Sequence, residues 1–356
     1  MRPQYHQHAL LFVALALAGC RNDSIGTLPS EPRPGLLASR HSAPDAPQFA
    51  DWSTAVHLDA PINSPCQDQT PTLSRDQLAL YFMSSRQGGL GNDTPDGCQD
   101  TFDLWVARRA SRDSPWDNPV NLGSPVNTPA NEAGPALSPD GRLLFFYRFE
   151  GAGGQRDIYV ARRAHRKHDV VWDAPVNLGP NVNTTASEEG PSYVRRGADG
   201  TALLFFDRGA TPLESDIYSV PVDRGGTPRG PGLPVAELNS SVEDNHVSVR
   251  ADGREIFFDS RRPGSAGFDI WTSTRPSVHD AWSTPVNLGA PVNSQFNEFH
   301  PNLSFDGRTL LFISGMNRKP NLGGFDIWMA TRTPLGDVDR EDDADASAGS
   351  PPRDLP

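Results

Sequence analysis

Five carboxylates that recur at a fixed distance from an asparagine are the residues of this sequence best suited to chemistry. The asparagines, each followed by Ser or Thr, are Asn63, Asn127, Asn183, Asn239 and Asn293. A carboxylate lies five residues after each of them: Asp68, Glu132, Glu188, Asp244 and Glu298. Loops usually tolerate changes of length, so a constant spacing indicates a geometric constraint on these segments.

Two kinds of chemistry fit this pattern. In the structural interpretation, the asparagine closes an Asx-type turn and the carboxylate accepts hydrogen bonds from backbone N–H groups. In the binding interpretation, the carboxylates form a ring whose mutual repulsion is relieved by a cation or by Lys or Arg of a partner chain. His246 and His300 follow two of the acids by two residues and would join the same rim. They could bind a transition metal there or be ordinary surface histidines, so a divalent cation is the one cofactor suggested.

The acids belong to a larger unit that recurs along the chain. Residues 116–163 show its order: Trp-Asp-Asn-Pro-Val-Asn-Leu-Gly, then Val-Asn-Thr, an Asp-Gly turn, an apolar run, and Asp-Ile-Tyr-Val. The turn aspartates are spaced by 64, 59, 53 and 54 residues and are Asp76, Asp140, Asp199, Asp252 and Asp306. Each period contains four short β-branched or aromatic segments, which is typical of a blade of a β-propeller.

Counting the strand candidates predicts how the ring closes. The fifth unit ends with its third strand, residues 325–330, while the missing outer strand occurs at the start of the domain, residues 52–58. We therefore expect an all-β, five-bladed propeller of four-stranded antiparallel blades, closed by the N-terminal strand pairing with the last blade. Because the first strand of a blade is innermost, the five acids should surround one mouth of the central channel.

A second acid recurs at the start of the third strand of each unit. These residues are Asp103, Asp157, Asp216, Asp269 and Asp326. Each is preceded by an arginine near the end of the second strand: Arg86, Arg148, Arg208, Arg261 and Arg318. The pattern predicts an arginine–carboxylate bridge that pins the hairpin inside each blade.

The turn and third-strand sequences carry a family resemblance. Leu-Ser-Pro-Asp-Gly-Arg at 137–142, followed by Asp-Ile-Tyr-Val at 157–160, resembles the WD40-like repeat of TolB-type propellers. The repeated Pro-Val-Asn-Leu-Gly resembles a version found in bacterial envelope proteins. The resemblance covers about residues 51–332 and implies a propeller of the cell envelope, although one fold serves many functions.

The two ends of the chain predict an export signal and a tail. An apolar run at 9–18, about half of the ~20 residues of a membrane-spanning helix, precedes Leu-Ala-Gly-Cys at 17–20, which resembles a bacterial lipobox. We expect a lipoprotein signal peptide over 1–20 with lipid on Cys20, an ordinary secretory signal being the alternative. A disordered tether (21–48), the propeller (49–333) and a disordered acidic tail (334–356) follow. Arg21 after the cysteine favours the outer membrane, facing the periplasm or the cell surface, with the lipid as the sole membrane anchor.

Two cysteines remain after lipidation, Cys66 and Cys98. In an oxidising compartment they could form a disulfide that contributes about 3–4 kcal/mol of stability in the loop-entropy model. A metal site is the alternative, but two isolated cysteines without CxxC or His spacing supply no ligand set.

Composition and missing motifs narrow the function. The net charge of −12 argues against nucleic acid as a partner. No Gly-x-Ser-x-Gly, Gly-rich nucleotide loop or HExxH occurs in the sequence. Because every blade offers nearly the same acid, we expect no enzyme but a monomeric, non-catalytic lipoprotein that binds an envelope protein, peptide or other envelope ligand at the acidic channel mouth. The alternatives are a glycoside hydrolase that uses channel-mouth carboxylates, which needs an acid and a base in different environments, and a purely structural spacer.

Overall fold

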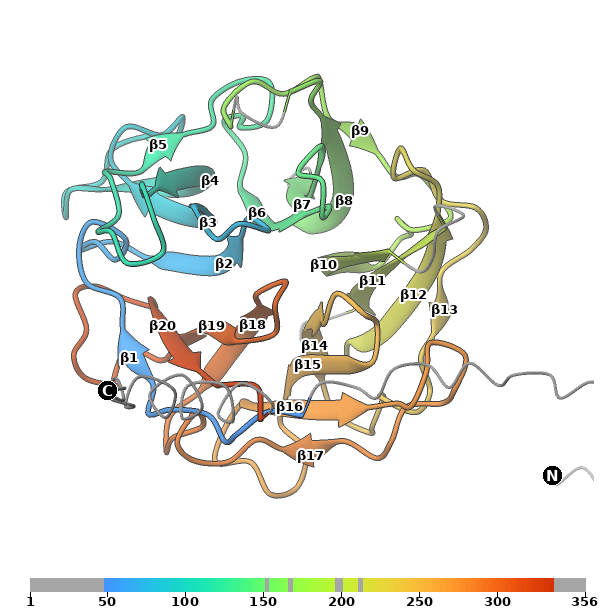
Figure 1. Cartoon of the computed structure of the whole chain (residues 1–356). Coiled ribbons are helices and arrows are strands. Elements are labelled where there is room, and N and C mark those ends of the chain that lie inside the picture. Colours follow the sequence, from blue (N-terminus) through green and yellow to red (C-terminus); the bar gives the residue numbers. More distant parts are fainter. Residues whose placement is uncertain (1–47, 151–153, 166–168, 196–200, 211–213, 336–356) are drawn as a thin grey trace, which may run out of the picture. The chain divides into compact units, whose positions relative to one another are not determined.

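Short apolar segments separated by Asp-Gly, Gly and Pro turns produce strands and loops, and no helix, in the part of the chain that the structure describes. The structure is a computed structural model, and it describes residues 48–150, 154–165, 169–195, 201–210 and 214–335. The strands form five sheets of four antiparallel strands each. Figure 1 shows these sheets arranged as blades around a common centre, with β2, β6, β10, β14 and β18 nearest to it.

The strands of each blade follow one another outward from the centre of the ring. Blade one contains β2 (Asp68–Leu73), β3 (Ala79–Arg86), β4 (Cys98–Arg108) and β5 (Val120–Asn121). Blade two contains β6 (Glu132–Leu137), β7 (Leu143–Glu150), β8 (Gln155–Arg162) and β9 (Val176–Asn177). Blade three contains β10 (Ser187–Arg195), β11 (Ala202–Gly209), β12 (Asp216–Val222) and β13 (Leu233–Pro234). Blade four contains β14 (Asp244–Val249), β15 (Glu255–Ser260), β16 (Asp269–Thr274) and β17 (Val286–Asn287). Blade five contains β18 (Glu298–Leu303), β19 (Thr309–Ser314), β20 (Asp326–Thr331) and β1 (Val56–His57).

The last blade takes its outer strand from the beginning of the domain. β1 pairs antiparallel with β20, with Val56 opposite Met329 and His57 opposite Trp328. Just before β1, the backbone N–H of Ser53 donates to the carbonyl of Thr331 at 2.7 Å, which extends the contact. The expected fold class and the expected closure of the ring are therefore confirmed.

Aromatic residues on the second strand of each blade form the packing between blades. Neighbouring pairs such as Phe145–Phe146 and Phe205–Phe206 are almost completely buried. Because successive side chains of a strand point to opposite faces, each pair contacts both neighbouring blades. Burial of a Phe side chain contributes about 1.5–3 kcal/mol, so these pairs account for much of the stability of the ring.

Every innermost strand contains a bulge at the same position, two residues after the repeated carboxylate. The register shifts there in all five blades. The residues at this position all have positive φ and are Thr70 (48°), Gly134 (62°), Gly190 (54°), His246 (45°) and His300 (50°). A positive φ is unfavourable for residues other than glycine, and such strain is typical of functional sites.

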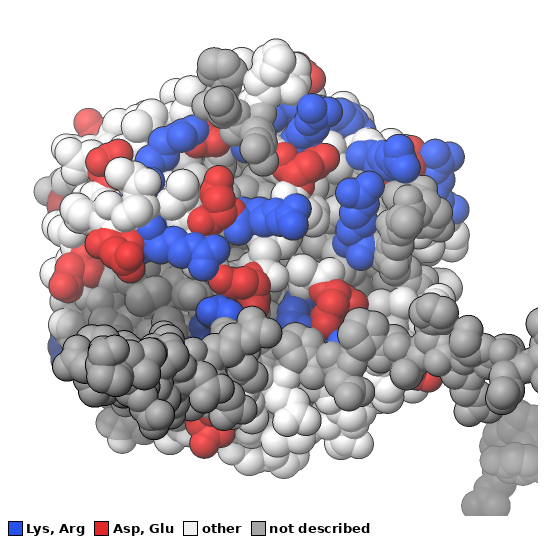
Figure 2. Space-filling model, in the orientation of Figure 1, with Lys and Arg blue, Asp and Glu red and all other residues white. Residues whose placement is uncertain are grey.

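Several expectations concern residues beyond these limits. The predicted signal peptide with Cys20, nearly all of the tether and nearly all of the tail lie outside the described residues. Within the described ranges, no helix is long and apolar enough to cross a membrane. On the face drawn in Figure 2, Lys and Arg side chains gather at the upper right, whereas basic and acidic side chains are interspersed at the left and in the centre.

Candidate functional site

The five repeated carboxylates lie inside the protein and do not form an exposed rim. The side chains of Asp68, Glu132, Glu188, Asp244 and Glu298 are all 0% exposed. In each blade the backbone N–H of the residue after the repeated asparagine donates to the carboxylate at 2.6–3.0 Å. The structure thus matches the structural alternative, and it differs from the expected acidic channel mouth.

An arginine binds each of these carboxylates, which corrects the expected pairing. The arginines, 2.6–3.0 Å from their acids, are Arg86, Arg148, Arg208, Arg262 and Arg318. The predicted bridges to the third-strand aspartates are therefore wrong. Asp103, for example, accepts a hydrogen bond from Asn121 Nδ2 at 2.7 Å instead. In blade four the arginine that binds the repeated acid Asp244 is Arg262, and not the expected Arg261.

The repeated asparagines link consecutive blades. Asn127 Oδ1 accepts the backbone N–H of Leu104 at 2.9 Å, and its Nδ2 donates to the Leu104 carbonyl at 2.9 Å. The same two bonds tie Asn63, Asn183, Asn239 and Asn293 to the third strand of the preceding blade. Asn and acid together hold the inter-blade loop, which explains their constant spacing.

The two cysteines belong to the same part of blade one. Cys66, just before β2, forms a disulfide with Cys98 at the start of β4. The two residues are 32 positions apart, so the bond closes the long loop of this blade onto the inner strand.

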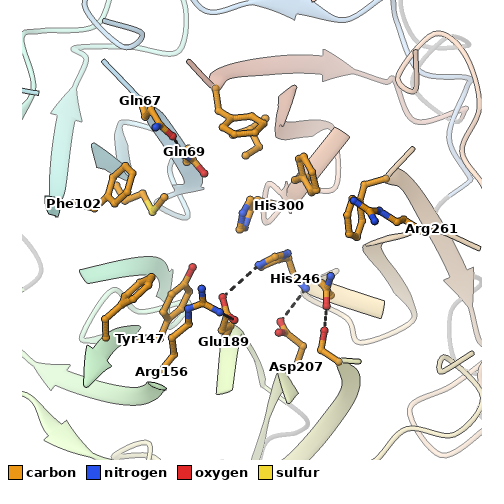
Figure 3. A pocket seen from close by; sticks show the side chains of 18 residues that line it. Gln67, Gln69, Phe102, Tyr147, Arg156, Glu189, Asp207, His246, Arg261 and His300 are labelled. Carbon is orange, nitrogen blue, oxygen red and sulfur yellow. Dashed lines mark hydrogen bonds and ion pairs between the residues drawn. The ribbon is translucent and has the colours of Figure 1, made fainter. Parts of the chain in front are cut away.

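A cavity of about 480 Å³ lies over the innermost strands and is the best-formed candidate site. Small-molecule sites are usually about 300–1,000 Å³ and combine apolar walls with a few polar groups. Six aromatic rings line this cavity: Phe102, Tyr147, Phe149, Phe268, Phe299 and Phe325. Its charged and imidazole side chains are Arg156, Glu189, Asp207, Arg261, His246 and His300 (Figure 3).

Glu189 and Asp207 are the acidic pair of this cavity. They lie directly opposite each other on β10 and β11, which places their Cβ atoms about 4.5–5.5 Å apart. Glu189 forms an ion pair with Arg156. The Asp207 carboxylate is 3% exposed and accepts the backbone N–H of His246 at 3.0 Å. Burial, assisted by the nearby Glu189, raises the pKa of Asp207 to about 7, although the charge of His246 opposes the shift.

His246 connects the acids of blades three and four. Its Nδ1 lies 3.0 Å from Asp259 Oδ1, and its Nε2 lies 4.0 Å from Glu189 Oε2. Burial alone would lower the pKa of this imidazole, but Asp259, followed by Asp207 and Glu189, raises it to about 9. His300 packs on it with ring centroids 3.6 Å apart. Burial and the charge of His246 hold the pKa of His300 well below its usual value.

The chemical groups come from two blades. At the position after the repeated acid, the five blades carry Gln69, Ala133, Glu189, Asn245 and Phe299. The residues paired with them on the second strand are Met83, Tyr147, Asp207, Asp259 and Ile313. Carboxylates therefore occur at these positions only in blades three and four. Their surroundings differ: Glu189 is paired with Arg156, Asp207 accepts a backbone N–H, and Asp259 contacts the His246 ring. Sequence reasoning missed them because it followed the repeated acid, whereas the signal was the departure from the repeat one residue later.

The structure brings together only part of the predicted site. His246 and His300 line the cavity, whereas none of the five repeated carboxylates or asparagines does. Among the described residues, no group of three or more His, Cys, Asp or Glu side chains has the arrangement to hold a metal ion.

Comparison with known proteins adds to this geometry. No protein-family model matches the sequence, and no curated protein is significantly similar to it. Among solved structures, the chain is similar to a GH43 endo-arabinanase from Bacillus licheniformis, with 12% identity and a TM-score of 0.54 over 77% of this chain and 95% of that one. A family 117 glycoside hydrolase from Zobellia galactanivorans has 13% identity and a TM-score of 0.53, over 85% of this chain and 98% of that one. A thermostable family-43 glycoside hydrolase has 10% identity and a TM-score of 0.51, over 77% and 91%.

These comparisons correct two expectations from the sequence. These three similar structures are glycoside hydrolases and not TolB-type repeat proteins. The predictions of a non-catalytic binding protein and of no enzymatic activity are contradicted by the same finding. Their premise concerned the five repeated acids, which are indeed equivalent but do not line the cavity. The acids that do, Glu189 and Asp207, are not repeated and have different surroundings. At such low identity the similarity establishes the propeller fold.

Proposed function

We propose that the protein is a glycoside hydrolase whose reaction takes place in the central cavity. The observation that carries this proposal is the pair of facing acids with different surroundings: Glu189 is ion-paired with Arg156, whereas Asp207 is buried without a cation bonded to it. Unequal environments assign opposite roles to two carboxyl groups, as glycoside hydrolysis requires. Aromatic walls suit the apolar faces of sugar rings, and the structurally similar proteins are glycoside hydrolases.

Asp207 is the general acid in this proposal. With a pKa of about 7 it carries a proton in weakly acidic solution and can donate it to the oxygen of the departing sugar. The backbone N–H of His246 holds Oδ1, so Oδ2 is the atom from which the proton is transferred. Positioned proton transfer of this kind contributes about 10²–10⁴-fold to the rate.

Glu189 is the reacting carboxylate. It either activates a water molecule or attacks the anomeric carbon itself, and the two routes give opposite anomers of the product. Arg156 orients Glu189 through the ion pair, and the imidazolium of His246 lies on its other side. Asp259 acts as a positioning residue, because it holds the His246 ring through Nδ1.

Hydrolysis of a glycan panel by the wild type, Asp207→Asn and Glu189→Gln tests the proposal. Both variants should lose at least about 10²-fold in kcat/KM on natural linkages. Asp207→Asn should lose much less on a dinitrophenyl glycoside, because that leaving group needs no proton. Glu237→Gln, an exposed glutamate outside the cavity, serves as the matched control. No hydrolysis of any panel member by the wild type, or full activity of both variants, would refute the assignment.

We also propose that the enzyme is lipid-anchored through Cys20 in the bacterial envelope. The support is the lipobox-like sequence at 17–20. Membrane fractionation of cells that express the wild type or Cys20→Ser tests this location, because only the wild type should sediment with membranes.

A further inference from the structure

Three cationic groups of the cavity have donors that no protein acceptor binds. Arg156 Nε and His246 Nε2 are buried and lack a hydrogen-bond partner. The guanidinium of Arg261 makes no hydrogen bond within the described residues, and its closest carboxylate oxygen, on Glu243, is 3.8 Å away. A buried polar group without a partner is unfavourable, so such donors indicate a ligand that supplies acceptors.

Arg261 owes its place to a departure from the repeat. Arg262 performs the structural role that one arginine has in each of the other blades, with Asp244 as its partner at 2.7 Å. Neighbouring residues point in different directions, so Arg261 turns into the cavity. Its guanidinium lies 4.1 Å from the centroid of the Phe268 ring, which in turn packs on Phe299 at 4.7 Å. The Arg261 side chain is 48% exposed, so its planar guanidinium, held in place by the Phe268 ring, is open to the cavity.

The cations lie on both sides of the acidic pair. Figure 3 shows Arg156 beside Tyr147 and Glu189 on one wall, Arg261 on the other, and His246 between them. Glu189 balances one of these three charges, and Asp259 balances another from behind His246. Glu243, 3.8 Å away, balances the charge of Arg261, but this distance is too long for a hydrogen bond, so the guanidinium donors can still bind a ligand.

We infer that the cavity selects glycans that carry an anionic group, which Arg261 binds next to the reacting sugar. This inference rests on the proposed hydrolase function and extends it to the substrate class. A carboxylate at C6 of a uronic acid matches the planar guanidinium in two parallel hydrogen bonds, and a sulfate ester offers the same kind of acceptor oxygens. A neutral sugar would offer no charged acceptor to the guanidinium of Arg261 or to the unbonded donors Arg156 Nε and His246 Nε2.

Matched ligands provide the test. Calorimetry would compare trisaccharides of galacturonic, glucuronic and mannuronic acid with the neutral trisaccharides that differ only at C6, and with a galactose 6-sulfate trisaccharide. The Asp207→Asn protein is used because it retains Arg156, His246 and Arg261. We expect at least one uronic or sulfated trisaccharide to bind about tenfold or more tightly than its neutral counterpart. The uronic and sulfated arms identify which anion is recognised.

Variants at Arg261 complete the experiment. Arg261→Gln should remove the preference for the anionic ligand while binding of the neutral one stays within about twofold, and Arg261→Lys should restore only part of it. Arg112→Gln, an arginine of similar exposure paired with Asp306 elsewhere, should change neither. Equal binding of anionic and neutral ligands, or an unchanged preference in Arg261→Gln, would overturn the inference.

Hydrolysis separates this inference from the proposed function. If the wild type cleaves neutral glycans at least as well as the matched acidic ones, and Arg261→Gln does not change this ratio, the anionic substrate class is wrong and the hydrolase stands. If anionic ligands bind through Arg261 but no glycan is cleaved, the hydrolase is wrong and the anion site stands.

Discussion

Replacement of Arg148 by methionine should destabilise the protein far more than loss of an exposed ion pair. Arg148 Nε donates to Glu132 Oε1 at 2.7 Å, and Nη2 donates to the Val126 carbonyl at 2.9 Å. Each charge-assisted hydrogen bond contributes about 1.5–3 kcal/mol, and Glu132, 0% exposed, would be left as a buried carboxylate without a cation. We therefore expect the free energy of unfolding to fall by about 3–5 kcal/mol at pH 8.

The loss should depend on pH, with a sign fixed by Glu132. Burial already raises the pKa of this carboxyl to about 7 despite its bonds to Thr128 and Arg148, and removal of the guanidinium raises it further. The folded variant then binds a proton that the unfolded chain releases above its ordinary pKa of 4.5. Stability of Arg148→Met is thus higher at pH 5 and is lost as the pH rises through the folded pKa.

Urea denaturation at pH 5 and pH 8 measures both effects. Arg229→Met is the control, because Arg229 is 66% exposed and its pair with Asp223 at 3.0 Å should contribute about 0–1 kcal/mol. The double variant Arg148→Met/Glu132→Gln should recover part of the loss at pH 8, because no buried charge remains. A loss in Arg148→Met no larger than the control, or one equal at both pH values, would contradict this account of the inter-blade loop.

Three further predictions concern the cavity and the disulfide. Asp207→Asn should raise the melting temperature relative to the wild type more at pH 8 than at pH 5. The reason is that the folded wild type loses a favourable proton from Asp207 as the pH rises through about 7. An equal difference at both pH values would count against the raised pKa. Gly190→Ala should abolish hydrolysis, because the added Cβ would lie 2.4 Å from Asp207 Oδ1 and 2.9 Å from His246 Cα. Gly154→Ala is the control in the same glycan assay. This glycine also has a positive φ, but a Cβ added there would meet no atom within 4 Å, so activity should be unchanged. Cys66→Ser/Cys98→Ser should lower the free energy of unfolding by about 3–4 kcal/mol in urea, and no change would argue against a bond that restrains the unfolded chain.

The fold could be predicted from the sequence because each blade repeats the same pattern of strand and turn residues. Alternating apolar residues, Asp-Gly turns and a constant period specify four strands per unit, and the strand count specified the pairing of β1 with β20. These signals are local or depend only on counting, so no knowledge of long-range contacts was needed.

The site could not be found in the same way, because repetition marks what every blade needs for packing. Glu188 recurs and proves to be a buried partner of Arg208, while the adjacent Glu189 does not recur and lines the cavity. Asp207 follows two buried phenylalanines where blade two has Tyr147. A comparison of the five units for residues that break the pattern would have identified both acids.

The choice between Arg261 and Arg262 shows a second limit. A difference of one residue reverses the direction of a side chain on a strand, and the sequence pattern does not fix the register at the end of β15. The spacing from the repeated acid to its arginine varies between blades, being 16 residues from Glu132 to Arg148 and 18 from Asp244 to Arg262. The sequence therefore leaves the partner of Asp244 open, and the structure shows that it is Arg262.

The joining of β1 to β20 also sets the order in which the protein can be completed. His57 and Asp326, in hydrogen-bond contact across this joint, are 269 residues apart. β1 is synthesised long before β20, so the fifth sheet can be completed only after β20 has been made. Contacts between residues so distant in sequence also form slowly. Until then β1 has no partner strand, and its unpaired backbone groups can pair with other chains. Nascent or truncated chains that lack this final strand should therefore be the ones most dependent on chaperones and most prone to aggregate.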